Sequence, residues 1–337
     1  MDVLAPTYDH LLALSDHRGT FEQAHAALPL PEHGYSTADM ASVLVVTTRE
    51  PGAGAAVCGL AKVAVRFLDG AQAFSGGCRN HMDSSGRWTD GFVFEDSWGR
   101  CLWALGSAAA HSDNGLIRRL AVVQFERAAH GRSKWPRAMA FAAVGAAELL
   151  SVEPGNAAAR KLIGDYAAGI AESIEDSAWP WPEERLATAG AVLAEAMIAA
   201  GVALEDAALS RRGLDLLGLL IERGTADGHL SSTQPIEVSM LADACARAST
   251  VDAAAIWPET VRAAAAWFQG DNAAGTLMWD PETGGGFDRL HADGVNADGV
   301  NADGVSADGV HADQGAESTL ALLSTFQQAR RYAVVPD

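Results

Sequence analysis

The sequence predicts an all-α protein built as a closed toroid of six helical hairpins, an (α/α)6 architecture. Apolar residues recur with the helical period in about twelve segments that Gly and Pro separate. The chain is 49% hydrophobic and only 20% charged, which favours tightly packed helices around a large core. Short turns alternate with longer irregular segments, as a ring of sequential helix pairs requires. An open helical solenoid is the competing architecture.

Each helix is placed by its apolar period and by the residues that bound it. Ser36 or Thr37 is a natural N-cap for the second helix. Between the third and fourth helices lies a Gly-rich polar segment, in which 71–75 and 86–89 are expected to pair as a short hairpin. The expected helices, with boundaries defined to within several residues, are 8–14, 37–49, 55–68, 94–110, 114–129, 136–150, 153–174, 184–201, 204–223, 235–248, 251–269 and 313–330.

The eighth helix is expected to open on the stretch Trp179-Pro180-Trp181-Pro182-Glu183-Glu184. Prolines stiffen the backbone there and cost no hydrogen-bond donor at a helix start. The two carboxylates follow in the first turn, where the helix dipole favours negative charge. Alone, this stretch predicts a helix start with aromatic packing. Aromatic residues beside polar or acidic ones recur at every second helix, and this recurrence indicates a function.

Residues 1–337 are expected to form a single (α/α)6 domain. A five-residue repeat occupies 291–313, just before the last helix, and places an aspartate in each copy. Calcium-binding β-rolls have a nine-residue period, and an EF-hand needs a twelve-residue loop that ends in a bidentate Glu. Neither pattern matches, so we expect an expanded, flexible loop of Asp-Gly turns.

Composition excludes several classes of partner. The formal net charge of −19 makes nucleic acid and anionic membranes poor partners. No apolar run is long enough to predict a membrane span, and the first residues do not resemble a signal peptide. The four cysteines show no paired spacing, so we expect reduced thiols, no metal, no cofactor and a cytoplasmic location. The sequence does not indicate an oligomeric state.

In a closed ring the even-numbered helices are the inner ones, and their N-termini meet at one mouth. Flat aromatic faces suit the C–H faces of a sugar ring, and polar side chains hydrogen-bond its hydroxyl groups. Glycoside chemistry needs two carboxyl groups. The expected catalytic residues are Glu95, Asp96, Glu183 and Glu317. The expected substrate-binding residues are His33, Tyr35, Asp39, His81, Trp98, Trp135, Trp181, Gln234, Glu237 and Gln314.

Structural roles compete with these assignments. Glu237 and Glu317 also suit first-turn helix acids, and Asp96 also suits a helix cap. Trp135 is more typical of a core residue than of a ligand platform. Convergence at one mouth is what favours function for the set.

Several blocks resemble a group of bacterial, glycosidase-like (α/α)6-barrel proteins that often accompany glycosyltransferases. His33-Gly34-Tyr35-Ser36-Thr37 resembles its HGYxT block. The run from Glu95 to Gly106 resembles its EDSHGRxLWALG block, and Trp179-Pro180-Trp181, Gln234-Pro235-Ile236-Glu237 and Gln314-Gly315-Ala316-Glu317-Ser318 resemble others. The resemblance extends through most of the chain and implies the barrel fold more specifically than any one reaction.

The chain departs from that pattern at several polar positions. Ala38-Asp39-Met40 stands where the group has Asp-Asp-Asn, and Trp98 replaces a histidine. Thr188 to Val192 replaces a Tyr-Asp-Asn-Ala-Arg run, and Ser232-Thr233 stands where Asp and Gln are usual. The carboxylates of Asp39, Glu95, Asp96, Glu183, Glu237 and Glu317 remain.

The first functional hypothesis is therefore a carbohydrate-active, glycoside hydrolase-like enzyme that acts on a small glycoside or sugar conjugate. The alternative is a degraded barrel that serves as a non-catalytic sugar-binding or scaffold protein, which the lost polar residues favour. A third hypothesis is a sugar epimerase or isomerase, a chemistry that usually needs a base titrating near neutral pH, such as histidine.

Overall fold

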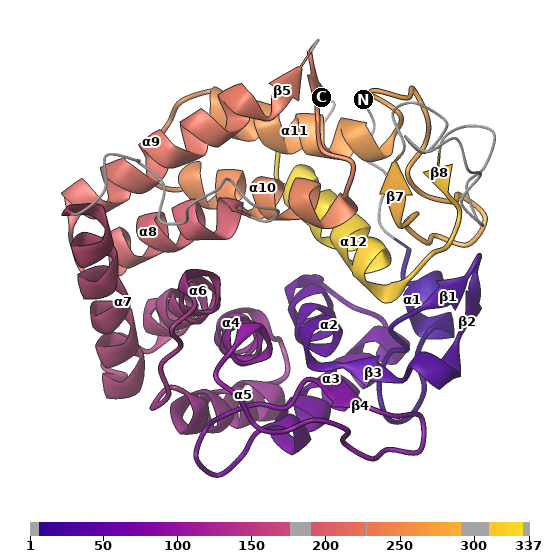
Figure 1. Cartoon of the computed structure of the whole chain (residues 1–337), viewed down its shortest axis with the longest axis horizontal. Helices are drawn as coiled ribbons and strands as arrows, with labels where there is room; N and C mark the ends of the chain where they lie inside the picture. Colours follow the sequence, from indigo (N-terminus) through magenta and orange to yellow (C-terminus); the bar gives the residue numbers. More distant parts are fainter. Residues whose placement is uncertain (1–6, 176–189, 227, 291–309, 333–337) are drawn as a thin grey trace. The chain divides into compact units, whose positions relative to one another are not determined.

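The computed structural model describes residues 7–175, 190–226, 228–290 and 310–332. This part of the chain contains twelve α-helices, one 3-10 helix and four two-stranded antiparallel sheets (Figure 1). The predicted all-α class and helix number are confirmed. The chain divides into two compact units. Unit 1 comprises residues 1–16, 20–33 and 219–337, and unit 2 comprises residues 17–19 and 34–218.

Unit 2 is a two-layered arrangement of helices. Helices α2, α4, α6 and α8 contact one another in that order, and α3, α5 and α7 pack against this row (Figure 1). Its elements are β3 (Tyr35–Ser36), α2 (Thr37–Arg49), α3 (Ala55–Ala71), β4 (His81–Met82), α4 (Asp96–His111), α5 (Gly115–Ala128), α6 (Pro136–Val152), α7 (Ala157–Glu175), α8 (Ala191–Ala203) and most of α9 (Ala207–Arg223).

Composition explains which helices form the inner row of unit 2. In α8 every residue from 191 to 201 is buried, and α6 is buried over nearly all of 138–150. A helix that is apolar on all sides must be surrounded by other elements. By contrast, α5 buries one face and exposes Leu116, Leu120 and Val123 on another.

Helices α4 and α6 pack backbone to backbone through three glycines. A Cβ atom on Gly99 would overlap the carbonyl oxygen of Ala138, and one on Gly106 would overlap that of Gly145. A Cβ on Gly145 would overlap the carbonyl oxygen of Leu102. Gly99, near the start of α4, lies against Ala138, near the start of α6, and Gly106 lies against Gly145 further along both helices. The two helices therefore run parallel, with their N-termini level.

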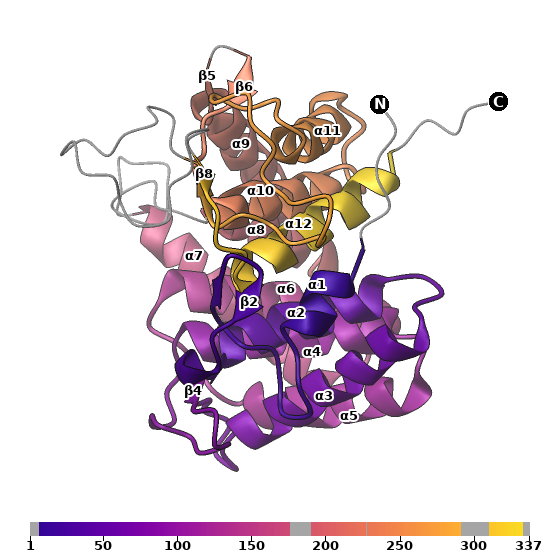
Figure 2. The same ribbon diagram turned by 90° about the vertical axis from the view of Figure 1, so that its right-hand side faces the viewer.

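Unit 1 packs three long helices around a smaller core. Helix α10 contacts both α11 and α12, and α11 contacts α12, as two perpendicular views show (Figures 1 and 2). Three hairpins β1–β2, β5–β6 and β7–β8 accompany them. The elements are α1 (Asp9–Ala13), β1 (Ala24–His25), β2 (Leu28–Pro29), η1 (Pro31–His33), β5 (Thr225–Ala226), β6 (His229–Leu230), α10 (Pro235–Ala248), α11 (Ile256–Phe268), β7 (Arg289–Leu290), β8 (Val310–His311) and α12 (Ala316–Arg330).

The expected hairpin between 71–75 and 86–89 is wrong. Met82 pairs with Trp88, and the amide of Thr89 donates to the carbonyl of His81 at 3.0 Å. Helix α3 continues to Ala71, so the first residue of the expected strand 71–75 is helical. Gln72, the next residue, pairs with Cys78. The turn sits at Asp83, whose carboxylate accepts from the amides of Ser85 and Arg87.

Most helix boundaries agree with the expected ones to within a few residues. Two helices start later than expected, for local reasons. At the start of α7, Asn156 accepts a hydrogen bond from the amide of Ala159 at 3.1 Å and acts as the cap. Before α11, the indole of Trp257 donates to Asp252 at 2.7 Å, which holds 252–255 outside the helix. The expected helix opening at 179–184 and the repeat at 291–309 lie outside the described residues.

No helix in the described ranges is both long and apolar enough to cross a membrane.

Replacing Gly106 with alanine tests the close packing of α4 and α6. The added methyl group has no space between the backbones, so we expect a loss of about 1–3 kcal/mol in the free energy of unfolding, measured by urea denaturation. Gly164 in α7 is the control, because its added Cβ meets no atom within 4 Å. Gly164→Ala should stabilise the chain by up to about 1 kcal/mol through helix propensity. Equal effects in the two variants would contradict this packing.

Candidate functional site

The level N-termini of α4 and α6 place three of the predicted site residues at the same end of these two helices. Glu95 occupies the N-cap position of α4 and Asp96 is its first residue, while Trp135 occupies the N-cap position of α6. All three are exposed. We refer to Glu95, Asp96, Arg100 and Trp135 as the α4–α6 site.

Arg100 holds the carboxylate of Asp96 in place. Its Nε donates to Oδ2 of Asp96 at 2.7 Å, one helical turn away. The side chain of Asp96 is 50% exposed, whereas that of Arg100 is only 11% exposed. The guanidinium carbon lies 4.7 Å from the ring centroid of Phe141 on α6. Asp96 therefore forms an ion pair rather than a helix cap, since its side chain makes no capping hydrogen bond.

Trp135 is 49% exposed, so the competing interpretation of this residue as part of the core is wrong. Pro136 follows it as the first residue of α6, which directs the chain before the helix away from the helix axis. The ammonium group of Lys134 lies 4.8 Å from the centre of the Trp135 ring. The indole therefore offers a flat face at the start of α6.

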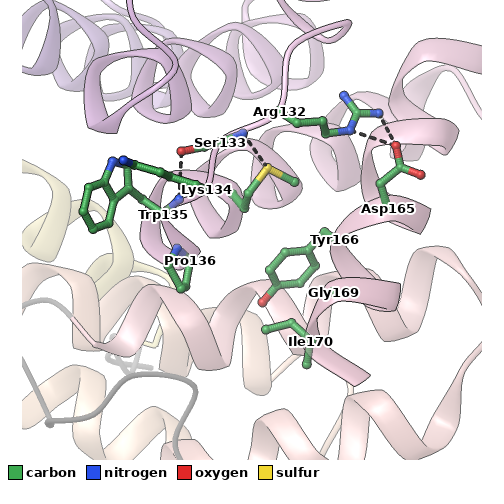
Figure 3. A pocket seen from close by; sticks show the side chains of 10 residues that line it. Arg132, Ser133, Lys134, Trp135, Pro136, Asp165, Tyr166, Gly169 and Ile170 are labelled. Carbon is green, nitrogen blue, oxygen red and sulfur yellow. Dashed lines mark hydrogen bonds and ion pairs between the residues drawn. The ribbon is translucent and has the colours of Figure 1, made fainter. Parts of the chain in front are cut away.

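A pocket of about 380 Å³ opens between the start of α6 and the later turns of α7 (Figure 3). Trp135, Pro136 and Met139 line one side, and Tyr166 and Ile170 line the other. Its size and largely apolar walls are typical of small-molecule sites. Burial raises the pKa of Tyr166, whose hydroxyl donates to the carbonyl of Leu193 at 3.3 Å.

An ion pair forms the polar wall of this pocket. Nε of Arg132 donates to Asp165 at 2.8 Å, and Lys161 donates to the same carboxylate oxygen at 2.8 Å. Hydrogen bonds from Lys161 and Arg132 lower the pKa of Asp165. A second cavity, of about 500 Å³, shares Arg132 and Asp165 and extends to His130 and Glu126.

The start of α2 holds Asp39 in a structural arrangement. The amide of Asp39 donates to Ser36 Oγ at 3.0 Å, and Ser36 Oγ donates to the Asp39 carboxylate at 2.6 Å. This reciprocal capping fixes Ser36 as the cap among the two expected candidates. His81 lies opposite Ser36 in the β3–β4 pair and is half-buried.

Trp98 and Tyr35 are fully buried, and neither presents a face to a ligand in this structure. The indole nitrogen of Trp98 donates to the carbonyl of Ala128 at 3.1 Å, and its ring contacts Phe94 edge-on. The Tyr35 ring contacts Phe67 edge-on. Both aromatic side chains pack in the core of unit 2.

Unit 1 holds the remaining described site residues. Glu237 lies in the first turn of α10 and accepts a hydrogen bond from Ser232 at 2.5 Å, next to Gln234 at the N-cap position. Glu317 lies in the first turn of α12 and is exposed. His33 is exposed at the end of η1.

Gln314 is buried in a polar network that precedes α12. It accepts a hydrogen bond from Thr283 at 2.7 Å, and its amide group donates to Asp280 at 3.2 Å. Nε2 of His10 donates to the carbonyl of Gln314 at 2.8 Å. Gln314 therefore connects the start of α12 to residues distant in sequence.

Sequence reasoning missed two titratable residues of this network. Asp288 accepts hydrogen bonds from the amide of Gly315, at 3.0 Å, and from the hydroxyl of Ser318, and so caps α12 from a distant loop. Burial raises the pKa of Asp288 and lowers that of His10. No local pattern marks either residue, because only tertiary packing buries them. The Gly284-Gly285-Gly286 run was the available signal, since a Cβ on Gly285 would overlap Gln314.

Each unit thus contains its own group of predicted residues. Unit 2 contains Tyr35, Asp39, His81, Glu95, Asp96, Trp98 and Trp135, and unit 1 contains His33, Gln234, Glu237, Gln314 and Glu317. Trp181 and Glu183 lie outside the described residues. Within the described ranges, no group of three or more His, Cys, Asp or Glu side chains is arranged to hold a metal ion.

Comparison with known proteins reveals similarity in structure. No family model matches the sequence, and no curated protein matches it. A sugar epimerase from a ruminal bacterium is 13% identical with a TM-score of 0.69, over 97% of this chain and 96% of that one. A D-mannose isomerase is 8% identical with a TM-score of 0.69, over 97% and 95%.

An inactive variant of the α-1,6-mannanase GH76A of a Salegentibacter species, in complex with α-1,6-mannotetrose, is also similar. It is 10% identical with a TM-score of 0.66, over 96% of both chains. These neighbours are (α/α)6 glycosidase-like enzymes, and their similarity covers nearly the whole chain. The chain therefore has the (α/α)6 toroid fold.

The two predicted tryptophans of the α4–α6 region should respond differently to truncation. Trp98→Ala removes a fully buried indole and should cost about 3–5 kcal/mol of unfolding free energy. Trp135→Ala removes a half-exposed side chain and should change stability by less than about 1 kcal/mol. Urea denaturation of both variants measures this difference. A large loss in Trp135→Ala would show that this residue belongs to the core after all.

His10 should make stability depend on pH. Burial favours its neutral form, so its folded-state pKa lies below the unfolded value of 6.5. Its contribution to stability is complete above pH 6.5 and is lost as the pH falls through the folded-state pKa. The drop in urea midpoint from pH 7.5 to pH 5 should therefore be smaller in His10→Gln than in the unmodified chain. His130→Gln, at an exposed position, should keep the full drop. An unchanged drop in His10→Gln would refute the prediction.

Proposed function

We propose that this chain is a carbohydrate-active, glycoside hydrolase-like enzyme that converts a small glycoside or sugar conjugate with paired carboxyl groups. The observation that carries the proposal is the α4–α6 site. Two consecutive exposed carboxylates, Glu95 and Asp96, stand level with the exposed indole of Trp135. A sugar ring that stacks on this indole presents its polar edge to side chains around it.

The geometry favours different roles for the two carboxyl groups. Asp96 is engaged by Arg100 as an ion pair, so we assign it the charged role of stabilising positive charge on the sugar. Glu95 makes no side-chain hydrogen bond or ion pair with any described residue, so we assign it the proton transfer to the leaving oxygen. The second reacting carboxyl group is proposed to come from Glu183 or Glu317.

The similar structures support the choice of residues. The mannanase variant is described as inactive and carries alanine in place of two consecutive aspartates. Glu95 and Asp96 are likewise consecutive acids, at the start of an inner helix. We propose that His33, Asp39, His81, Gln234, Glu237 and Gln314 contribute polar groups to sugar binding, together with the undescribed Trp181.

A sugar epimerase or isomerase is the second candidate. A sugar epimerase and a D-mannose isomerase are among the similar structures, which favours this chemistry. His81 would be the base, since it is half-buried next to the start of α2. A non-catalytic sugar-binding protein is the third candidate, because the chain lacks several polar residues of the group it resembles.

We further propose a bacterial origin, an association with glycosyltransferases and a cytoplasmic location. The block resemblance supports the first two. All four cysteines are free thiols, which supports the third.

Substitution of the carboxylates tests the proposed reaction. A thermal-shift screen against monosaccharides, nucleotide sugars and short oligosaccharides, with product analysis of each hit, first identifies a converted sugar. On that sugar, Glu95→Gln should lower kcat by about 10²–10⁴, because the proton donor is lost. Asp113→Asn, an exposed carboxylate just beyond the opposite end of α4, should leave kcat unchanged.

The products separate the three candidates. Release of a reducing sugar indicates hydrolysis, and a rearranged sugar of unchanged mass indicates epimerisation or isomerisation. Binding without conversion across the panel would leave the non-catalytic candidate. Full activity in Glu95→Gln would eliminate Glu95 as the proton donor.

A further inference from the structure

Arg100 is a buried cation whose hydrogen-bonding capacity is only partly used. The residue is 9% exposed, and Nε is its only nitrogen that donates a hydrogen bond within the described part of the chain. Neither terminal nitrogen has an acceptor among the described residues. Neither is among the fully buried side-chain atoms that lack a hydrogen-bond partner. Among the described residues, both terminal nitrogens are thus left for a further acceptor beside Asp96.

Other arginines of unit 2 show what a structural arginine does in this protein. Arg132 binds Asp165 through Nε and a terminal nitrogen, and its other terminal nitrogen donates to the carbonyls of Ala129 and Gly131. Arg127 likewise binds both Gln72 and Asp69. The paired terminal nitrogens of Arg100 have no acceptor in the described ranges, and this fork is the part of a guanidinium that matches a carboxylate or phosphate.

Packing fixes where this open fork lies. The guanidinium stacks over Phe141, and the same ring contacts Trp103 with centroids 5.6 Å apart. Arg137 precedes Phe141 by one turn on the same face of α6, so a second guanidinium belongs to this end of the helix. Stacking on Phe141 removes rotational freedom from Arg100, so little more is lost when a ligand binds.

The surroundings of Arg100 favour negative charge in spite of the acidic chain. Segment 131–147 holds the basic residues Arg132, Lys134 and Arg137 and no acidic one. The N-termini of α4 and α6 are level and parallel, so their dipoles add positive potential at the same place. Glu95 and Asp96 oppose this potential, and Arg100 already offsets Asp96. Arg132 is already paired with Asp165, so Lys134 and Arg137 are the further basic residues at this end of α6.

We propose that the open fork of Arg100 binds an anionic group of the sugar, so that the substrate is an acidic sugar such as a uronic acid or a sugar phosphate. The inference rests on the proposed function for the sugar ligand. It adds that the sugar carries a negative charge, which Arg100 recognises. Arg100 is a binding residue in this scheme, and Asp96 orients its guanidinium. A carboxylate and a phosphate share the required chemistry, and the two arms of the test distinguish them.

The test compares the affinities of D-glucuronate, D-glucose 6-phosphate, D-glucose and inorganic phosphate by titration calorimetry. We expect one of the two acidic sugars to bind about tenfold to a hundredfold more tightly than glucose, as charge-assisted hydrogen bonds predict. The preference should weaken with added salt. Glucuronate as the tighter ligand indicates a carboxylate site, and glucose 6-phosphate indicates a phosphate site.

Variants locate the preference at Arg100. Arg100→Gln should bind the acidic sugar no more tightly than glucose, whereas Arg119→Gln removes the same charge from an exposed position on α5 and should behave as the unmodified chain. Arg100→Lys keeps the charge and most of the volume but not the fork, and should lose about tenfold in affinity for the acidic sugar. If Arg100→Gln does not fold, Arg100→Lys tests the inference in its place.

The outcomes separate this inference from the proposed function. Equal affinity for acidic and neutral sugars, or a preference that survives in Arg100→Gln, overturns the inference, and conversion of a neutral glycoside in the product screen would then still support the enzyme. Inorganic phosphate that binds as tightly as glucose 6-phosphate also overturns it, because the sugar would then play no part. Selective binding of an acidic sugar in the titrations, together with no conversion of any glycoside or sugar in the product screen, upholds the inference and rejects the enzyme.

Discussion

Close contact between the backbones of α4 and α6 is the constraint on which the candidate site depends. Gly99, Gly106 and Gly145 allow the helices to approach until each glycine meets a carbonyl oxygen of the other helix. At this distance neither helix can slide or rotate without a clash, so the ends of the two helices are fixed at one level. The position of Asp96 relative to Trp135 follows from that packing and not from any direct contact between them.

The same constraint explains why polar groups gather at helix ends. Helix α8 is buried at every residue from 191 to 201, and α6 is buried over most of its length. A side chain in the middle of these helices faces other helices, and an unpaired polar group there would be costly. Asp243 on α10 pairs with Ser324 on α12 at 3.1 Å, whereas the buried hydroxyl of Ser107 on α4 has no partner among the described residues. Helix N-termini are the remaining places for a polar site, and their free amides and dipoles favour acids and anions there.

Sequence pattern was sufficient for the helices, because most have an apolar face that repeats every three to four residues and α8 is apolar on all sides. Local chemistry was sufficient for the Ser36 cap but not for the start of α11, which depends on a hydrogen bond between Trp257 and Asp252. At the site, Glu95 and Asp96 were identified from their place at a helix start. Asp288 and His10 were not, since their burial results from packing between segments far apart in sequence. The exposures of Trp98 and Trp135 were beyond sequence reasoning, since both stand at similar places near helix starts.

The structure also changes the meaning of the departures from the (α/α)6 group that the chain resembles. Trp98 replaces a histidine, yet position 98 is buried and its indole donates to the end of α5, away from Asp96. Met40 replaces a polar residue at another fully buried position. Asp39, between two altered positions, is retained in a capping arrangement with Ser36. Met40 and Trp98 fill buried space in the core. Their apolar side chains therefore give little support to the hypothesis that the chain has lost its reaction. In the block that resembles EDSHGR, the exposed acids Glu95 and Asp96 are intact, as is Arg100, which pairs with Asp96, and this favours an active enzyme over a degraded barrel.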